Sequence, residues 1–81
     1  MTFQQLEEEW GNEEIMPVKE VAHVLAISER RVVREARRRN VEVSVLLTKA
    51  PDLTKSGARF LCWVPVAFAL ELAKAVAAQT A

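Results

Sequence analysis

The sequence is poor in several residues on which whole classes of sites depend. Cys62 is the only cysteine, which excludes an internal disulfide and fits a reducing, cytoplasmic location. His23 is the only histidine and has no cysteine pair near it, so no zinc-binding spacing is present. Two glycines, Gly11 and Gly57, do not form a phosphate-binding loop. We therefore expect no metal and no cofactor.

Long apolar runs are also missing. No uninterrupted run approaches the ~18 residues of a membrane span, so we expect no membrane partner. Residues 1–14 carry five glutamates and no lysine or arginine, which is unlike a signal peptide. Of the 81 residues, 51% are hydrophobic, so a compact core is feasible. We expect residues 1–81 to form one domain.

The charges of the chain are unevenly distributed, although they cancel in total. Residues 15–40 carry seven basic and three acidic groups, whereas residues 1–14 carry acidic groups alone. Local potential matters more than net charge over a Debye length of roughly 8–10 Å. A basic segment can therefore bind phosphates while the acidic N-terminal segment points elsewhere.

Apolar periodicity predicts a helix from Thr2 to Trp10 and a second helix that opens at Met16-Pro17. Proline suits a first helical turn because its missing N–H is not needed there. The second helix ends at a turn, Ala26-Ile27, and Ser28 is a natural N-cap for the helix that follows. Residues 16–39 thus have the pattern of a helix-turn-helix.

The third helix, Glu29 to Arg39, has two chemically different sides and ends near Asn40. At about 100° per residue, Val32, Val33 and Ala36 fall on one side. Basic residues fall opposite them or flank them, and this set comprises Arg30, Arg31, Arg34, Arg37, Arg38 and Arg39. Such a helix is shaped and charged to enter the major groove of DNA.

Two β-branched segments follow, and they predict a hairpin over residues 41–64. Val41 to Leu47 alternates, with Val41, Val43, Val45 and Leu47 on one side. Arg59 to Val64 forms the second strand, and residues 48–58 form a long tip. Pro65 begins a last helix that ends at Gln79. The fold class we expect is α+β, mainly α.

The last helix is apolar over more than half its circumference and needs burial on two sides. A homodimer contact through Phe68, Leu72 and Val76 is one explanation. A central position in the core of a monomer is the other, and the sequence does not decide between them.

The segment Val18-Lys19-Glu20-Val21-Ala22-x-x-Leu25-Ala26-Ile27-Ser28 resembles the opening of the winged helix-turn-helix domains of the MerR and excisionase type. Gly57-Ala58-Arg59-Phe60 resembles the start of the second strand of their β-hairpin wing. The similarity covers roughly residues 16–75. It implies double-stranded DNA as the partner, with no small-molecule substrate. It also implies a small repressor, or an excisionase of a phage or mobile element that assists an integrase.

Two departures from that family concern the helices. Ala26 replaces the usual turn glycine, so the turn either avoids a left-handed conformation there or tolerates modest strain. Glu35 stands where a hydrophobic residue is common, and we expect Ala36 to take over its packing.

DNA contacts are expected from three groups of residues. In the third helix, Arg30, Arg31 and Arg34 are expected on bases, and Arg37, Arg38 and Arg39 on phosphates. On or beside the wing, the candidates are Lys49, Lys55 and Arg59. Lys19 and Ser28 complete the set through the DNA backbone, with a simple cap as the alternative role of Ser28.

The alternative function is a protein-interaction module, such as a small packaging subunit, that uses the acidic N-terminus and the apolar last helix. No triad of catalytic residues is present, so we do not expect an enzyme. We expect Trp10 and Trp63 to pack in the core, Cys62 to be at least half-buried, and His23 to be solvated.

Overall fold

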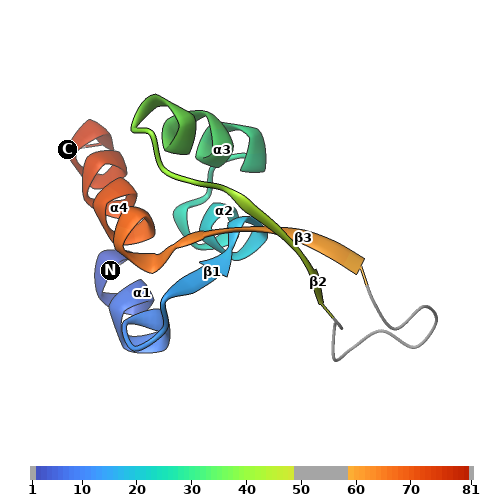
Figure 1. Ribbon diagram of the computed structural model, residues 1–81. Helices are drawn as coiled ribbons and strands as arrows, with labels where there is room; N and C mark the ends of the chain where they lie inside the picture. The colour runs from blue at the N-terminus through green and yellow to red at the C-terminus, as the bar shows by residue number, and fades with distance from the viewer. Residues whose placement is uncertain (1, 49–58, 81) are drawn as a thin grey trace.

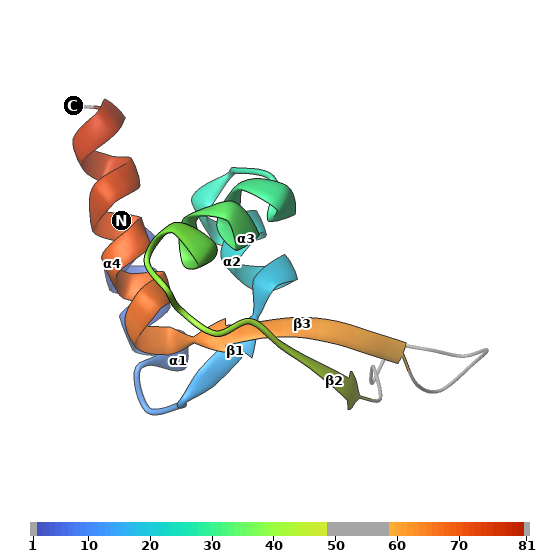
Figure 2. The ribbon, with the colours of Figure 1, turned by 45° about the horizontal axis from the view of Figure 1, so that its top comes forward.

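The computed structural model describes residues 2–48 and 59–80, which form an α+β fold that is mainly helical. Its helices and strands are α1 (Thr2–Trp10), β1 (Ile15–Pro17), α2 (Val18–Leu25), α3 (Glu29–Arg38), β2 (Ser44–Thr48), β3 (Arg59–Pro65) and α4 (Val66–Thr80) (Figure 1). α1 and α4 lie side by side at one end, and β2 and β3 extend from the other (Figures 1 and 2).

The strands form one antiparallel sheet in the order β1-β3-β2. The pairing of β2 with β3, from Ser44 opposite Trp63 to Thr48 opposite Arg59, confirms the predicted hairpin. β1 was not predicted, because Met16-Pro17 was expected to open a helix. Met16 instead pairs with Val64, and Pro17 ends the strand directly before α2. Proline is tolerated there because β1 is an edge strand and lasts three residues.

β2 begins three residues later than the alternation predicted. Asn40 has a left-handed φ of 57°, and the Val41 N–H donates to the Ala36 carbonyl at 2.8 Å. This hydrogen bond ends α3, so residues 41–43 serve as a connection. Val41 and Val43 pack half-buried against the core, whereas Val45 is 61% exposed.

The core is built from α1, β1, α2, α3, β3 and α4. Its largest fully buried side chains are Leu6, Met16, Val18, Val21, Val32, Val64 and Leu72. Trp10 packs half-buried against this core, as predicted. The Lys74 ammonium lies 5.0 Å from the centre of the Phe3 ring, a contact that joins α4 to α1. None of the described helices is long and apolar enough to cross a membrane.

α4 packs inside the monomer, in agreement with the second of the two explanations for its apolar surface. Phe68 and Leu72 are 5% and 1% exposed, and Val76 is half-buried. α4 packs against α1, α2 and β3, which cover its apolar sides. The alternative, a helix central to the monomer core, is therefore the one that the structure favours.

The turn between α2 and α3 contains Ala26 in a left-handed conformation, with φ 57° and ψ 43°. The Ile27 N–H donates to the Ala22 carbonyl at 3.1 Å, and the Ala26 N–H donates to the His23 carbonyl at 3.3 Å. This is the Schellman pattern that usually ends in glycine. The turn therefore tolerates strain, which for one left-handed alanine amounts to about 1–2 kcal/mol.

We expect Ala26→Gly to stabilise the protein by about 0.5–1 kcal/mol, because glycine adopts this φ without a Cβ clash but loses more entropy on folding. The check is urea unfolding followed by circular dichroism. The matched control is Ala75→Gly inside α4, where the same change should destabilise by about 1 kcal/mol. A lower stability for Ala26→Gly would contradict the observed turn.

Val32→Asp should unfold the protein, because Val32 is 0% exposed and an unpaired carboxylate there loses several kcal/mol of solvation. Val45→Asp is the control, since the same change at an exposed valine should leave the thermal transition in place. A folded Val32→Asp variant would show that α3 has a different rotation about its axis.

Candidate nucleic-acid interface

The rotation of α3 about its axis is fixed from two sides. Val32 and Ala36, both 0% exposed, join the core that α2 contributes to. At the start of the helix, the Ser28 hydroxyl accepts a hydrogen bond from the Arg31 N–H at 3.1 Å, which confirms the predicted cap. The side of α3 opposite Val32 must therefore face solvent.

That solvent side forms an arginine face, which we define as Arg30, Val33, Arg34, Arg37 and Arg38. These residues line one shallow hollow on the surface, and all four arginines are exposed. Within residues 2–48 and 59–80, Arg38 is the only one of these arginines that forms an ion pair. The remaining three guanidinium groups are available to an anionic ligand.

Glu35 neutralises part of the positive charge at the edge of this face. Its carboxylate lies 3.1 Å from Arg38 and 3.8 Å from Arg39. The Arg38 side chain is 71% exposed, and such surface pairs contribute little, about 0–1 kcal/mol. Arg38 can therefore exchange Glu35 for a phosphate. Ala36 takes the buried position beside Glu35, as expected.

Arg31 and Arg39 are directed toward α4 and do not join the arginine face. The Arg31 guanidinium donates to the Gln79 side-chain oxygen at 2.6 Å. The Arg39 guanidinium carbon lies 5.9 Å from the centre of the Phe68 ring. The expectation that Arg31 clusters with Arg30 and Arg34 is therefore wrong, because Arg31 lies on the side of α3 that meets α4.

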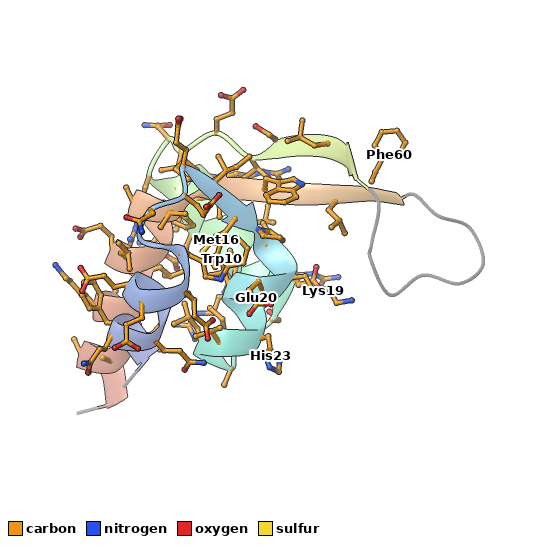
Figure 3. The ribbon with its side chains drawn as sticks, turned by 90° about the horizontal axis from the view of Figure 1, so that it is seen from below. Trp10, Met16, Lys19, Glu20, His23 and Phe60 are labelled. Atoms are coloured by element: carbon orange, nitrogen blue, oxygen red, sulfur yellow. The ribbon has the colours of Figure 1, made fainter. Side chains whose placement is uncertain are left out.

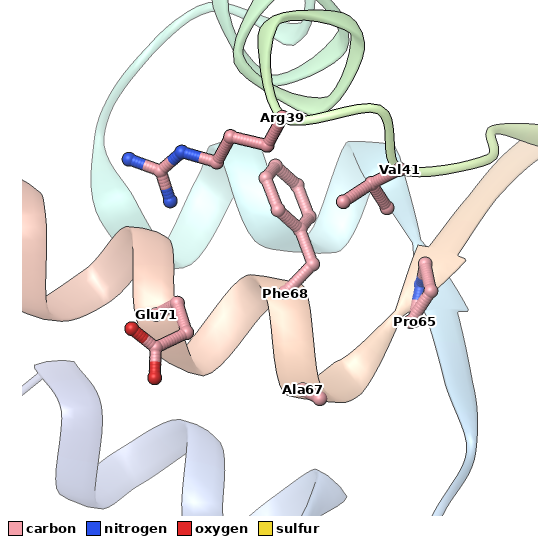
Figure 4. Close-up of a pocket in the computed structure, with 6 residues that line it drawn as sticks. All are labelled: Arg39, Val41, Pro65, Ala67, Phe68 and Glu71. Carbon is pink, nitrogen blue, oxygen red and sulfur yellow. The ribbon is translucent and has the colours of Figure 1, made fainter.

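Arg39 instead borders a second hollow of about 370 Å³. Its lining is Arg39, Val41, Pro65, Ala67, Phe68 and Glu71 (Figure 4). Figure 4 shows the Phe68 ring between Arg39 and Val41, with the Glu71 carboxylate lying apart from it. The hollow is largely apolar, so its chemistry suits an apolar side chain better than a phosphate.

The other predicted DNA contacts lie in different parts of the structure, and two of them lie outside the described residues. Lys19 is exposed at the start of α2, on the side from which the hairpin extends (Figure 3). Ser28 is exposed, and its hydroxyl acts as the helix cap. Lys49 and Lys55 lie outside the described residues, and Arg59 is placed by its backbone as the first residue of β3.

Several remaining polar and aromatic residues bear on other kinds of site. His23 is exposed on α2, as predicted (Figure 3). Across the described residues, no group of three histidine, cysteine or acidic side chains could hold a metal ion. Trp63 is half-buried, and its indole N–H is buried without a hydrogen-bond partner in the described part of the chain. Cys62 is exposed, which corrects the prediction that it is at least half-buried.

Sequence reasoning missed one surface, the exposed apolar residues of the hairpin. Phe60 is 68% exposed, more than any other large hydrophobic residue in the described ranges. The alternation along a strand shows which side chains share a face, but it does not show where the covering helices end.

Comparisons of the chain with protein-family models, with curated proteins and with solved structures found no match. A function therefore has to be argued from the residues and geometry of the chain itself.

Proposed function

We propose that this chain is a sequence-specific, double-stranded DNA-binding protein with a winged helix-turn-helix architecture. α2 and α3 form the helix-turn-helix, α3 is the recognition helix, and the β2–β3 hairpin is the wing. The observation that supports this most directly is the arginine face, a row of exposed guanidinium groups on a helix whose other side is fixed in the core.

The spacing of these arginines suits the major groove of DNA. The groove is about 12 Å wide and admits one α-helix. Arg30 and Arg34 lie in the first half of α3, from which recognition helices contact base edges, and the guanidinium fork matches guanine O6 and N7. Arg37 and Arg38 lie near the end of the helix and are assigned to phosphates.

The distribution of acidic residues supports the same orientation. Glu7, Glu8 and Glu9 are exposed on α1, which packs against α4 at a distance from α3 (Figure 1). A polyanion is repelled by this end and attracted by the arginine face. The charge separation along the molecule therefore favours one direction of approach to DNA.

Two biological roles are compatible with this binding mode, and neither involves catalysis by this chain. In an excisionase-like role, adjacent copies bind direct repeats, bend the DNA and assist an integrase. In a repressor role, paired copies bind an inverted repeat over a promoter. The arrangement of binding sites and the bending of DNA distinguish the two.

The second candidate function is a protein-interaction or assembly module. The apolar hollow beside Phe68 is the observation in its favour, because it could hold an apolar side chain of a partner (Figure 4) and its lining shares no residue with the arginine face. The salt dependence of DNA binding separates this function from the first.

Arg34→Ala should lose about 1–3 kcal/mol of affinity for a duplex selected from a random pool, and preference at one base pair should relax. Fluorescence anisotropy with selected and scrambled duplexes gives both values. Arg31→Ala is the control, because Arg31 bonds to Gln79 and lies off the arginine face. Equal losses on both duplexes would reassign Arg34 to phosphate, and no loss on either would overturn the proposed interface.

DNA affinity should fall steeply with salt. With roughly five to eight cations on phosphates, the slope of log K against log salt should be about −4.5 to −7. Titrations between about 50 and 200 mM salt measure it. A flat response at micromolar protein would reject DNA binding and favour the interaction module.

A further inference from the structure

The β2–β3 hairpin extends beyond the core as an arm, which we define as residues 44–48 and 59–63. Figure 3 shows Phe60 near the outer end of this arm, away from the helices. Large exposed hydrophobic residues are rare elsewhere in the described ranges, where Ile15 is the single example. The arm contains Val45, Leu46 and Phe60, which are 61%, 43% and 68% exposed.

The strand register places the arm residues on a continuation of the core. Val45 is paired with Cys62, and Phe60 lies two residues before Cys62, so the three share one face of the sheet. Val64 continues that face and pairs with Met16, and both are fully buried. The same apolar face is thus covered near the body and exposed along the arm.

β2 is also an edge strand, because the sheet order is β1-β3-β2. Among the described residues, no strand lies on its outer side. Natural edge strands are commonly protected by a lysine, another charge or a proline. The segment Ser44–Thr48 contains none of these.

The composition of the arm restricts what can cover it. Arg59, at the outer end of the arm, is its one charged residue, and residues 44–48 and 60–63 include no charged side chain. Phosphates and charged peptides need countercharges, which residues 44–48 and 60–63 do not provide. An uncharged strand with apolar side chains fits it, and a second copy of β2 has that composition.

We propose that β2 pairs antiparallel with β2 of a second copy about a two-fold axis. The two hairpins then form one continuous sheet, in which Val45 of each copy lies at the seam and Phe60 lies one strand further from it on the same face. Such a contact is isologous and closes at two chains. A stable interface buries about 800 Å² per partner, and a five-residue strand pair with few apolar side chains offers less. We therefore expect dissociation in the micromolar range.

If the proposed DNA binding holds, this dimer also selects a class of DNA site. A two-fold axis relates the two α3 helices, so they read an inverted repeat. The arrangement favours the repressor role over binding to direct repeats. This consequence depends on DNA binding, whereas the pairing of the arms does not.

Sedimentation of the full chain without DNA, from about 1 to 200 µM, tests the dimer. The wild type should shift from monomer to dimer. Val45→Lys should raise the dissociation constant at least tenfold, because the two-fold axis brings the two substituted β2 strands together and places their ammonium groups close to each other. Ile15→Lys is the matched control on the other edge strand and should leave it unchanged. Circular dichroism confirms that each variant is folded.

Cross-linking identifies the surface independently. Val45→Cys in a Cys62→Ser background should form a covalent dimer with a short bismaleimide, and Ile15→Cys in the same background should not.

A monomeric wild type at 200 µM, or equal effects of Val45→Lys and Ile15→Lys on the dissociation constant, would overturn the proposal. Weaker DNA binding by Val45→Lys at unchanged mass would assign the arm to DNA instead. A dimer that binds no DNA would reject the proposed function alone.

Discussion

The burial of Val32 and Ala36 against the core is the constraint on which the surface of this protein depends. These two side chains set the rotation of α3, and the Ser28 cap sets where the helix begins. A rotation of one residue, about 100°, would bring Arg31 outward and turn other arginines toward the core. The exposure of four arginines on one face of α3 thus follows from two small apolar contacts rather than from the charges themselves.

Local patterns were sufficient to predict α1 and α3 nearly to the residue, and also the end of α2, whose start was predicted two residues too early. Their signals are apolar periodicity, the Ser28 cap and the left-handed end at Asn40, all of which act within one helical turn. β1 could not be predicted in this way. Its three residues include a proline, and they are extended because β3 lies beside them, which is a tertiary effect.

In the candidate site too, the positions that depend on one helix alone were predicted, and those that depend on tertiary contacts were not. The helical wheel placed Arg30, Arg34 and Arg38 correctly, since their positions depend on α3 alone. Arg31 was misplaced because its partner, Gln79, is 48 residues away in the sequence. The exposure of Val45 likewise depends on how far the covering helices extend along the sheet. The alternation of residues within a strand does not indicate where those helices end.

The two proposed surfaces use different physical forces. The arginine face is proposed to bind phosphates through charge, whereas β2, which carries no charged residue, is proposed to associate through strand pairing and apolar contact. A weak dimer is sufficient in this arrangement, because one α3 bound to DNA holds the second copy at a high effective concentration. The two α3 helices of such a dimer would then bind DNA more tightly than one helix does. Neither the contact between the arms nor the contact of a single helix with DNA needs a high affinity by itself. Because β2 carries no charged residue, its edge has no attraction for phosphates and is left to the strand contact.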